Sequence, residues 1–342
     1  MTQTTINDDS ILFDKLKNAK GEIPYTFIND YMFRVILQKH IRVLKSIVCA
    51  CLNLNKEDII EITIQNPIKL GEAIDDKTFI LDINVLLNSN TVINLEMQVL
   101  DLNDWPERSL SYLSRSYDNV AKGCDYIDVK PVYHIGFLNY TLFPEYPEFF
   151  AKYQLLNVKN HNVYTSKFNL YVIDLTRTDL ATDEDEKSGL LHWIRIFKAK
   201  TWEELSQMAE MQQEFREAAE ALYLYNQDEV VKQQCRARQD YYNHEQATKK
   251  KIEEARIALE EARIALAEKD TALKEKDTAL KEKDTALKEK DTALKEKDTA
   301  LKEKDTALKE KDTALSTSVK LLAESMGISE REAYEIIGIK HM

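Results

Sequence analysis

A seven-residue repeat occupies much of the last third of the chain and restricts what that segment can fold into. Between Glu253 and Leu315, two copies of EEARIAL are followed by AEKDTAL and then by near-perfect EKDTALK units, so a leucine recurs at every seventh residue. The units consist of strong helix formers, and a constant period of seven in such residues predicts one long helix. At 1.5 Å per residue this helix would span on the order of 95 Å.

The single leucine per unit leaves two interpretations of the repeat open. A coiled-coil seam requires two apolar positions in each heptad, and the second position here is Ala in the first two units and Lys or Asp in the rest. Pairs of aspartate and lysine four residues apart, such as Asp270 and Lys274, stabilise an isolated helix by roughly 0.2–0.5 kcal/mol each. A weak parallel coiled coil, which would make a homo-oligomer through the tail, and a solvated single helix therefore both fit. Residues 246–316 are a spacer in either case.

The rest of the chain divides into a leader, a globular domain and a short C-terminal pair of helices. Residues 1–24 are polar, which favours a flexible leader. Residues 25–245 are rich in Ile, Leu, Val, Phe and Tyr and are long enough to bury one core. In residues 317–342, Gly327 ends one short helix and Ser329 begins a capping box for the next. Since this last helix is acidic, we expect the pair to serve packing or dimerisation rather than DNA recognition.

Charge and cysteine content exclude several classes of protein. The formal net charge of −12 argues against a protein that coats nucleic acid, so any DNA contact has to come from a local basic face and bound cations. The four cysteines form no CxxC pair, and we expect reduced, mostly buried thiols and a cytoplasmic location. The polar N-terminal segment predicts no secretory signal peptide, and no apolar run approaches the roughly 18 residues of a membrane span, so no membrane partner is expected.

The hydrophobic period changes along residues 25–245 in a way that predicts an α+β domain with a mixed sheet rather than a regular βαβ repeat. Asp104 and Pro106 indicate a helix start, and Gly123 indicates its end. The expected elements, in chain order, are one or two helices at 28–54, strands at 59–68, 77–87 and 91–100, a helix from 104 to about 122, strands at 131–138 and 163–175, and helices from 179 to about 242.

Two of these strands, 77–87 and 91–100, alternate cleanly between apolar and polar residues. Such alternation places one set of side chains in the core and the other set on the opposite face. The expected core positions are Phe79, Leu81, Ile83, Val85 and Leu87 in the first strand and Ile93, Leu95, Met97 and Val99 in the second. Residues 88–90 between the strands supply turn chemistry.

The polar faces of these two strands bring acidic residues together. A turn centred on Ser89 places Asp82 across from Glu96 and Asn84 across from Asn94. Facing residues in an antiparallel pair have Cβ atoms roughly 5 Å apart, and like charges at that distance repel. A divalent cation with oxygen ligands would relieve that repulsion. The alternative is a solvent-exposed polar face on which the two carboxylates meet without any such role.

Specific segments of the chain resemble a known nuclease family. Asp82 in LDI, followed by Glu96 and Gln98 in NLEMQ, resembles the D…ExQ variant of the PD-(D/E)XK motif. More widely, residues 26–245 and the C-terminal helices resemble the Rpn family of recombination-promoting nucleases, which are often labelled transposases. The segments that carry the likeness are DYMFRVIL, IQNPI, ILDINVLLNSNTVINLEMQ, SYLSRSYDNVAKGCDYIDVKPVYHIGFLNY, FNLYVIDL and LLAESMGISEREAYEIIGI.

This resemblance implies a restriction-endonuclease-like αβββαβ core with a metal site at the edge of its sheet. Asp82 and Glu96 would be the ligands of Mg²⁺ or of another divalent cation such as Mn²⁺ or Ca²⁺. Gln98 stands where the wider superfamily has lysine, so it would orient water without carrying charge. Arg108 and Arg115, on the next expected helix, would contact DNA phosphates, or else belong to a solvated helix face.

Three functions remain in contention at this point. The first is a metal-dependent DNA endonuclease that nicks or cuts DNA and so promotes recombination. The second is a catalytically inactive DNA-binding or oligomeric interaction protein on the same fold. The third, a transposase in the strict strand-transfer sense, lacks a recognisable end-binding domain. The chain has no nucleotide-binding glycine motif and no histidines at ligand spacing, and we expect His134 to be a packed histidine in a strand.

Overall fold

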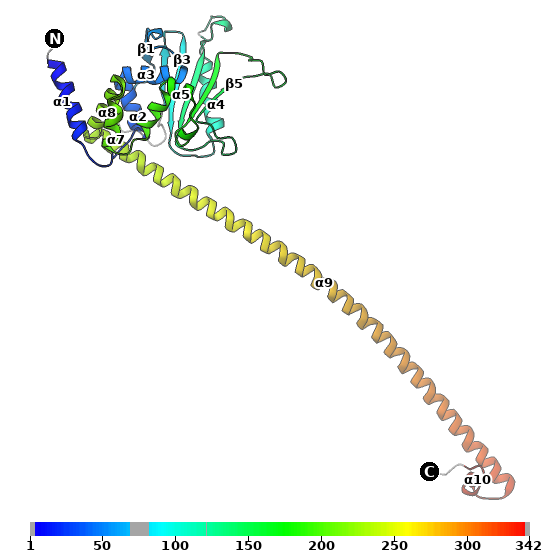
Figure 1. Cartoon of the computed structure of the whole chain (residues 1–342). Helices are drawn as coiled ribbons and strands as arrows, with labels where there is room; N and C mark the ends of the chain where they lie inside the picture. Colours follow the sequence, from blue (N-terminus) through cyan, green and yellow to red (C-terminus); the bar gives the residue numbers. More distant parts are fainter. Residues whose placement is uncertain (1–3, 69–81, 121, 339–342) are drawn as a thin grey trace. The chain divides into compact units, whose positions relative to one another are not determined.

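The computed structural model describes residues 4–68, 82–120 and 122–338 of the chain (Figure 1). These residues form two compact units, Met1–Lys251 and Ile252–Met342. Among them, no helix has both the length and the apolar character that crossing a membrane requires. The four cysteines are free thiols, and three of them are buried, as expected from the sequence.

The first unit is built on a six-stranded mixed sheet with the order β1-β2-β3-β4-β6-β5. The strands β1, β2 and β3 are antiparallel, β3, β4 and β6 are parallel, and β5 is antiparallel to β6. The bounds are β1 Ile62–Ile64, β2 Ile83–Leu87, β3 Thr91–Gln98, β4 Val132–Leu138, β5 Phe150–Gln154 and β6 Phe168–Asp174. The sequence did not predict β5, and β6 begins later than the expected strand at 163–175.

Helices cover both faces of this sheet. In chain order they are α1 Thr4–Asn18, α2 Asp30–Lys39, α3 Ile41–Leu52, α4 Trp105–Tyr117, α5 Asp183–Lys187, α6 Leu190–Lys198, α7 Trp202–Ala209 and α8 Gln213–Tyr225, with short 3-10 turns at Lys56–Asp58, Tyr126–Asp128 and Thr178–Leu180. The main core lies between the sheet and helices α2, α3, α6 and α8, whereas α4 covers the opposite face (Figure 1). The order helix, three strands, helix, strand agrees with the expected αβββαβ core.

The hairpin of β2 and β3 has the register that the sequence predicts. Asn84 pairs with Asn94, and Ile83 pairs with Leu95. Asn88 and Ser89 in the turn both adopt left-handed backbone conformations, with φ of 47° and 57°. Turns of this kind match the twist of the strands that they connect and so stabilise the hairpin. The expected core positions that the structure describes lie in the main core or against it, while Phe79 and Leu81 lie outside the described residues.

The N-terminal segment and helix α4 also differ from the prediction. Residues Thr4–Asn18 form helix α1 instead of a loose leader, and Phe13 and Leu16 on it are buried in the main core. Helix α4 ends at Tyr117 rather than near residue 122. Asn119 explains this early end, because its side chain donates to the carbonyl of Ser116 and accepts from the backbone of Lys130. These bonds compete with the backbone bonds that would continue the helix.

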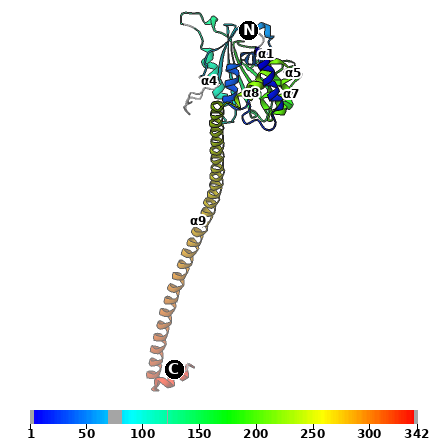
Figure 2. The ribbon, with the colours of Figure 1, turned by 90° about the vertical axis from the view of Figure 1, so that its left-hand side faces the viewer.

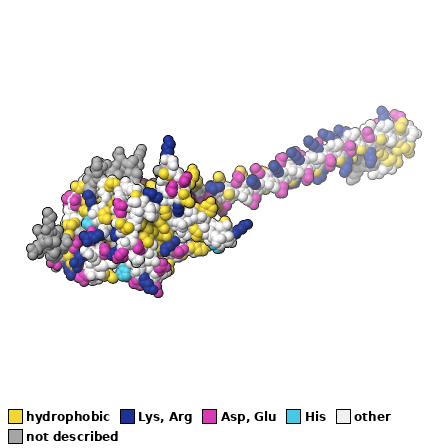
Figure 3. Space-filling view, turned by 90° about the horizontal axis from the view of Figure 1, so that it is seen from above, with side chains coloured by type: hydrophobic (Ala, Val, Ile, Leu, Met, Phe, Trp, Pro, Cys, Tyr) yellow, Lys and Arg dark blue, Asp and Glu magenta, His cyan; other side chains and the backbone are white. Residues whose placement is uncertain are grey.

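The repeat lies within one helix, α9, which runs from Glu229 to Met326 over 98 residues (Figures 1 and 2). Acidic and basic side chains alternate along it (Figure 3). A second helix, α10 Glu330–Ile336, follows with the expected capping box between Ser329 and Glu332. The helix before Gly327 is therefore the end of α9 and not a separate short helix. Val319, Ala323 and Ala333 form a small buried cluster where α10 folds back.

Candidate active site

Asp82 and Glu96 lie on the α4 face of the sheet, at the adjoining ends of β2 and β3. Asp82 directly precedes β2, one residue beyond the pair of Ile83 and Leu95. Both carboxylates are buried, with 5% of Asp82 and 4% of Glu96 exposed. The solvated polar face that was the alternative at the sequence level is therefore absent at these two positions. Instead, α4 covers the face, and its Leu113 contributes to a small core cluster there.

A buried arginine fixes the backbone at Asp82. Arg34 on α2 donates to the Asp82 carbonyl and to the backbone and side-chain oxygens of Asn66, which follows β1. Asn66 in turn donates to the same Asp82 carbonyl at 3.0 Å and accepts from the backbone of Asn84 at 2.9 Å. Three separate segments of the chain therefore converge on the position from which Asp82 projects into the pocket.

The electrostatics of the two carboxylates are dominated by burial. Burial raises the pKa of Glu96 to about 7, against the opposing effect of Arg108, and the charge of Asp82 raises it further. The Nη2 of Arg108 donates to Oε1 of Glu96 at 2.7 Å. The pKa of Asp82 is also raised by burial, despite the nearby guanidinium of Arg34. The two groups thus lie in a site that lacks sufficient positive charge of its own, as the raised pKa values indicate.

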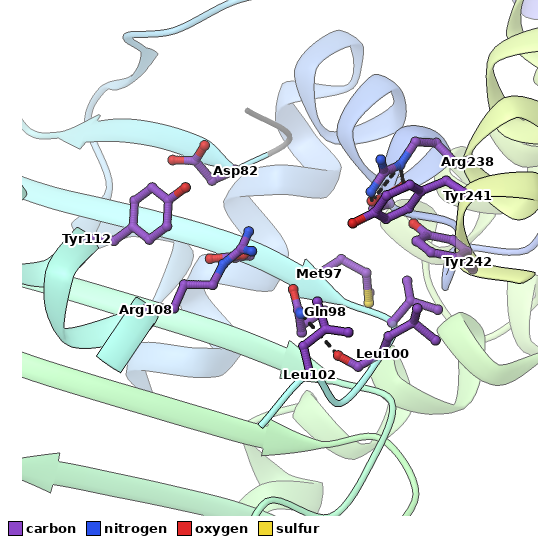
Figure 4. Close-up of a pocket in the computed structure, with 13 residues that line it drawn as sticks. Asp82, Met97, Gln98, Leu100, Leu102, Arg108, Tyr112, Arg238, Tyr241 and Tyr242 are labelled. Atoms are coloured by element: carbon purple, nitrogen blue, oxygen red, sulfur yellow. Dashed lines mark hydrogen bonds and ion pairs between the residues drawn. The ribbon is translucent and has the colours of Figure 1, made fainter. Parts of the chain in front are cut away.

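A small pocket opens beside these carboxylates (Figure 4). Its cavity volume is about 60 Å³, which is enough for an ion with a few water molecules. Asp82, Arg108 and Tyr112 lie on one side of it, and Arg238, Tyr241 and Tyr242 from the first turns of α9 lie on the other. Arg238 is held there by a salt bridge to Asp30 of α2.

Gln98 lines the same pocket and is buried, with 8% of the residue exposed. Its side-chain Nε2 donates to the carbonyl of Leu100 at 3.0 Å (Figure 4). This bond fixes the orientation of the amide, so its Oε1 remains the group that can accept a hydrogen bond from a water molecule.

The two arginines that we expected to contact DNA lie on α4, each close to the ring of Tyr112. The guanidinium carbons of Arg108 and Arg115 lie 5.6 Å and 5.9 Å from the ring centre of Tyr112. Arg108 is paired with Glu96 at the pocket, whereas Arg115 is exposed outside it. The structure therefore brings Arg108 into the site and leaves Arg115 on the surface nearby.

The donor set fits a hard divalent cation. Carboxylate oxygens are the preferred ligands of Mg²⁺, and Oε2 of Glu96 is buried without a hydrogen-bond partner among the described residues. The mutual repulsion of Asp82 and Glu96 would be relieved by a cation between them. In the part of the chain that the structure describes, no three His, Cys, Asp or Glu residues are placed so that all of them could hold a metal ion, so water and substrate oxygens would complete the coordination.

Several residues of the site were not identified from the sequence. Arg34 lies in an apolar helical segment, Asn66 follows a strand and Arg238 lies in a polar helical segment, and their contacts cross long stretches of sequence. His134 was expected to be merely packed, and it is fully buried, but its Nε2 lies 3.7 Å from Oε2 of Glu96. The resemblance did include the segments that contain all of these residues except Arg238, and that was the available signal.

The sheet order, the helical cover and the two carboxylates define a mixed α+β nuclease fold of the restriction-endonuclease-like class. Residues 27–255 match the family model described as PD-(D/E)XK nuclease family transposase, and the chain belongs to this family. No curated protein and no solved structure matches the chain. The family membership supports a nuclease-type function and agrees with the Rpn resemblance.

Proposed function

We propose that the protein is a metal-dependent DNA endonuclease that hydrolyses phosphodiester bonds, nicking or cutting DNA and thereby promoting recombination. The observation that carries the proposal is the pair of buried carboxylates, Asp82 and Glu96, on one face of a nuclease-family sheet beside a pocket. Two buried acidic groups in adjacent positions destabilise a fold unless a cation offsets their charge. Such an arrangement is typical of a functional site.

In this proposal Asp82 and Glu96 hold Mg²⁺, or another divalent cation such as Mn²⁺. When bound, the ion supplies Lewis-acid stabilisation of the phosphate and lowers the pKa of a water molecule. Gln98 orients the attacking water through its Oε1, because its amide nitrogen is engaged by Leu100. Arg108 neutralises part of the phosphate charge at the pocket, and Arg115 contacts the DNA backbone further along α4.

The alternative is a catalytically inactive DNA-binding or interaction protein on the same fold. That alternative predicts no requirement for the carboxylates, whereas the nuclease depends on both. The raised pKa values of Asp82 and Glu96 favour the nuclease, because a protein without a metal site would gain stability by replacing either group with a neutral one.

The deciding experiment is cleavage of supercoiled plasmid by the purified full-length protein with Mg²⁺, and again with excess chelator. Nicked or linear product that appears only with the metal supports the proposal. The Asp82→Ala variant tests whether the cleavage comes from this protein or from a contaminating nuclease. Asp240→Asn, a change at an exposed position on α9, is the control. Metal-dependent cleavage that survives in folded Asp82→Ala protein would contradict the proposal.

We infer that the tail is a spacer and a site of weak self-association, and that the protein is cytoplasmic. The leucines of the repeat from Leu259 to Leu308 are exposed, from 60% at Leu273 to 71% at Leu294, so they are available to a second copy of the helix. The free thiols of the four cysteines agree with a reducing compartment. Sedimentation velocity over a range of protein concentrations tests the self-association.

A further inference from the structure

His134, in the middle of β4, faces a carboxylate of the proposed metal site. In the parallel pair of β3 and β4, Asn94 lies opposite His134, so their side chains share the α4 face with Glu96. His134 is fully buried. Its Nε2 lies 3.7 Å from Oε2 of Glu96, which is longer than a formed hydrogen bond. Neither atom has a hydrogen-bond partner among the described residues.

The other ring nitrogen of His134 determines where its proton resides. Nδ2 of Asn94 lies 3.1 Å from Nδ1 of His134. An amide NH₂ group only donates, so Nδ1 is the acceptor, and a neutral imidazole with Nδ1 as acceptor carries its proton on Nε2. The ring is therefore a neutral donor whose N–H points toward Glu96.

Two aromatic side chains from α4 hold the ring in this orientation. Tyr112 stacks on it with ring centres 6.1 Å apart and an interplanar angle of 9°, and Trp105 lies 5.5 Å away at 37°. Trp105 can lie this close because β4 has glycine at position 136, where a Cβ would overlap the indole. The ring has little freedom to turn, and a shift of less than about 1 Å would bring Nε2 within hydrogen-bond distance of Oε2.

We propose that Asn94 and His134 form a relay that positions Glu96 as a metal ligand. Asn94 fixes the tautomer, His134 donates from Nε2 to Oε2 of Glu96, and Arg108 holds Oε1. This inference rests on the proposed function, and it assigns His134 a positioning role in that same site. A carboxylate oxygen has two lone pairs, so each oxygen that accepts one hydrogen bond keeps one lone pair for a cation. A neutral donor also adds no charge that would repel the cation.

Two substitutions separate donation from packing. His134→Gln retains an N–H group that reaches Glu96, whereas His134→Leu fills a similar volume without a donor. Partners that orient metal ligands change metal affinity by roughly 10–100-fold, so we expect the leucine variant to bind Mn²⁺ that much more weakly and the glutamine variant to stay within about threefold of wild type. Mn²⁺ binding is measured on the full-length protein by electron paramagnetic resonance, independently of cleavage. In a Glu96→Gln background, the leucine substitution should have no further effect.

The metal-free protein provides a second readout. The ¹⁵N chemical shifts of the His134 ring show which nitrogen is protonated, and we expect the proton on Nε2. A proton on Nδ1 overturns the relay. A glutamine variant that binds Mn²⁺ as weakly as the leucine variant also overturns it, because the ring nitrogen of His134 would then be a metal ligand itself. If the leucine variant binds Mn²⁺ as tightly as wild type, the relay is overturned but the proposed function is not. Absence of Mn²⁺ binding in wild type overturns the proposed function together with the relay.

Discussion

Arg34 on α2 donates to the backbone carbonyl of Asp82, although 48 residues separate the two in sequence. Arg34 is fully buried, and its guanidinium also binds Asn66, two residues after the end of β1. Burial lowers the pKa of Arg34 to about 10, while Asp82 raises it, so the side chain stays charged at neutral pH. The residue that positions the candidate metal ligand therefore also supplies charged donors to buried backbone carbonyls.

Replacing Arg34 with methionine should destabilise the protein by about 3 kcal/mol, because the buried carbonyls of Asn66 and Asp82 lose their main donor. Urea unfolding of the purified variant measures this free energy. Arg42→Met is the matched control, because the Arg42 side chain is 67% exposed and pairs with Glu217, and ion pairs of exposed side chains contribute less than about 1 kcal/mol. Equal effects of the two substitutions would contradict a structural role specific to Arg34.

Asp82→Ala should lower the rate of plasmid cleavage roughly a thousandfold or more, which corresponds to about 4 kcal/mol of barrier. The reason is that the variant loses one of the two carboxylates proposed to hold the cation. Its stability should not fall much, because burial raises the pKa of Asp82 and a group with a raised pKa is less stable in its ionised form. Nicking assays in Mg²⁺ and circular dichroism on the same sample check both expectations.

The hairpin that carries the site could be predicted from the sequence because its signals are local. Alternating residues give the two faces, and the asparagines around Ser89 fix the turn, so the pairing of Asn84 with Asn94 follows within one supersecondary unit. The environment of the polar face could not be predicted in this way. It depends on α4 covering Glu96 and on β4 pairing in parallel with β3, which brings in His134.

The wrong predictions for two elements also arise from contacts between residues that are distant in sequence. The segment Thr4–Asn18 has only a weak helical pattern of its own. In the structure it is helical, and its Phe13 and Leu16 pack into the main core, which is distant in sequence. Tertiary contacts of this kind override local propensity. The end of α4 was placed too late because Asn119 forms bonds to Lys130, a residue outside the helix pattern.

Gln98→Ala should reduce cleavage by less than Asp82→Ala, on the order of 10–100-fold, because a neutral amide orients water but does not bind the cation as a charged ligand. The affinity for Mn²⁺ should stay near that of wild type, since Gln98 is proposed to act on water. Steady-state cleavage and Mn²⁺ titration of the same preparation measure the two effects separately. A loss of Mn²⁺ affinity as large as that of Asp82→Ala would instead assign Gln98 to the metal.

The stability of the metal-free protein should fall as pH rises from about 4.5 to about 7. The folded state keeps the proton of Glu96 up to a pKa of about 7, raised mainly by burial, whereas the unfolded chain releases it near 4.5. Because the folded state binds more protons in this window, the free energy of unfolding decreases with pH, by about 3 kcal/mol in total from this group. Thermal unfolding at several pH values, with chelator present, measures the trend.

Glu96→Gln is the control for this trend, because the amide does not titrate. The variant should show a shallower decline in stability between about pH 4.5 and 7, even if its absolute stability differs through the loss of the Arg108 pair. Parallel slopes in wild type and Glu96→Gln would mean that Glu96 ionises in the folded protein as it does in the unfolded chain.

Deleting residues 281–294, two complete repeat units, should leave the melting temperature of the nuclease domain within about one degree, because the change removes no buried apolar surface. Leu287 and Leu294 in this stretch are 63% and 71% exposed. Its other interactions are internal to the helix: Thr285 donates to the carbonyl of Lys281, and Lys288 pairs with Asp284. The deletion also preserves the heptad phase, so any self-association should weaken in proportion to length without changing register. Differential scanning calorimetry reports the domain, and sedimentation velocity reports the tail. A drop of several degrees in the domain transition would show that the repeat stabilises the nuclease unit and is more than a spacer.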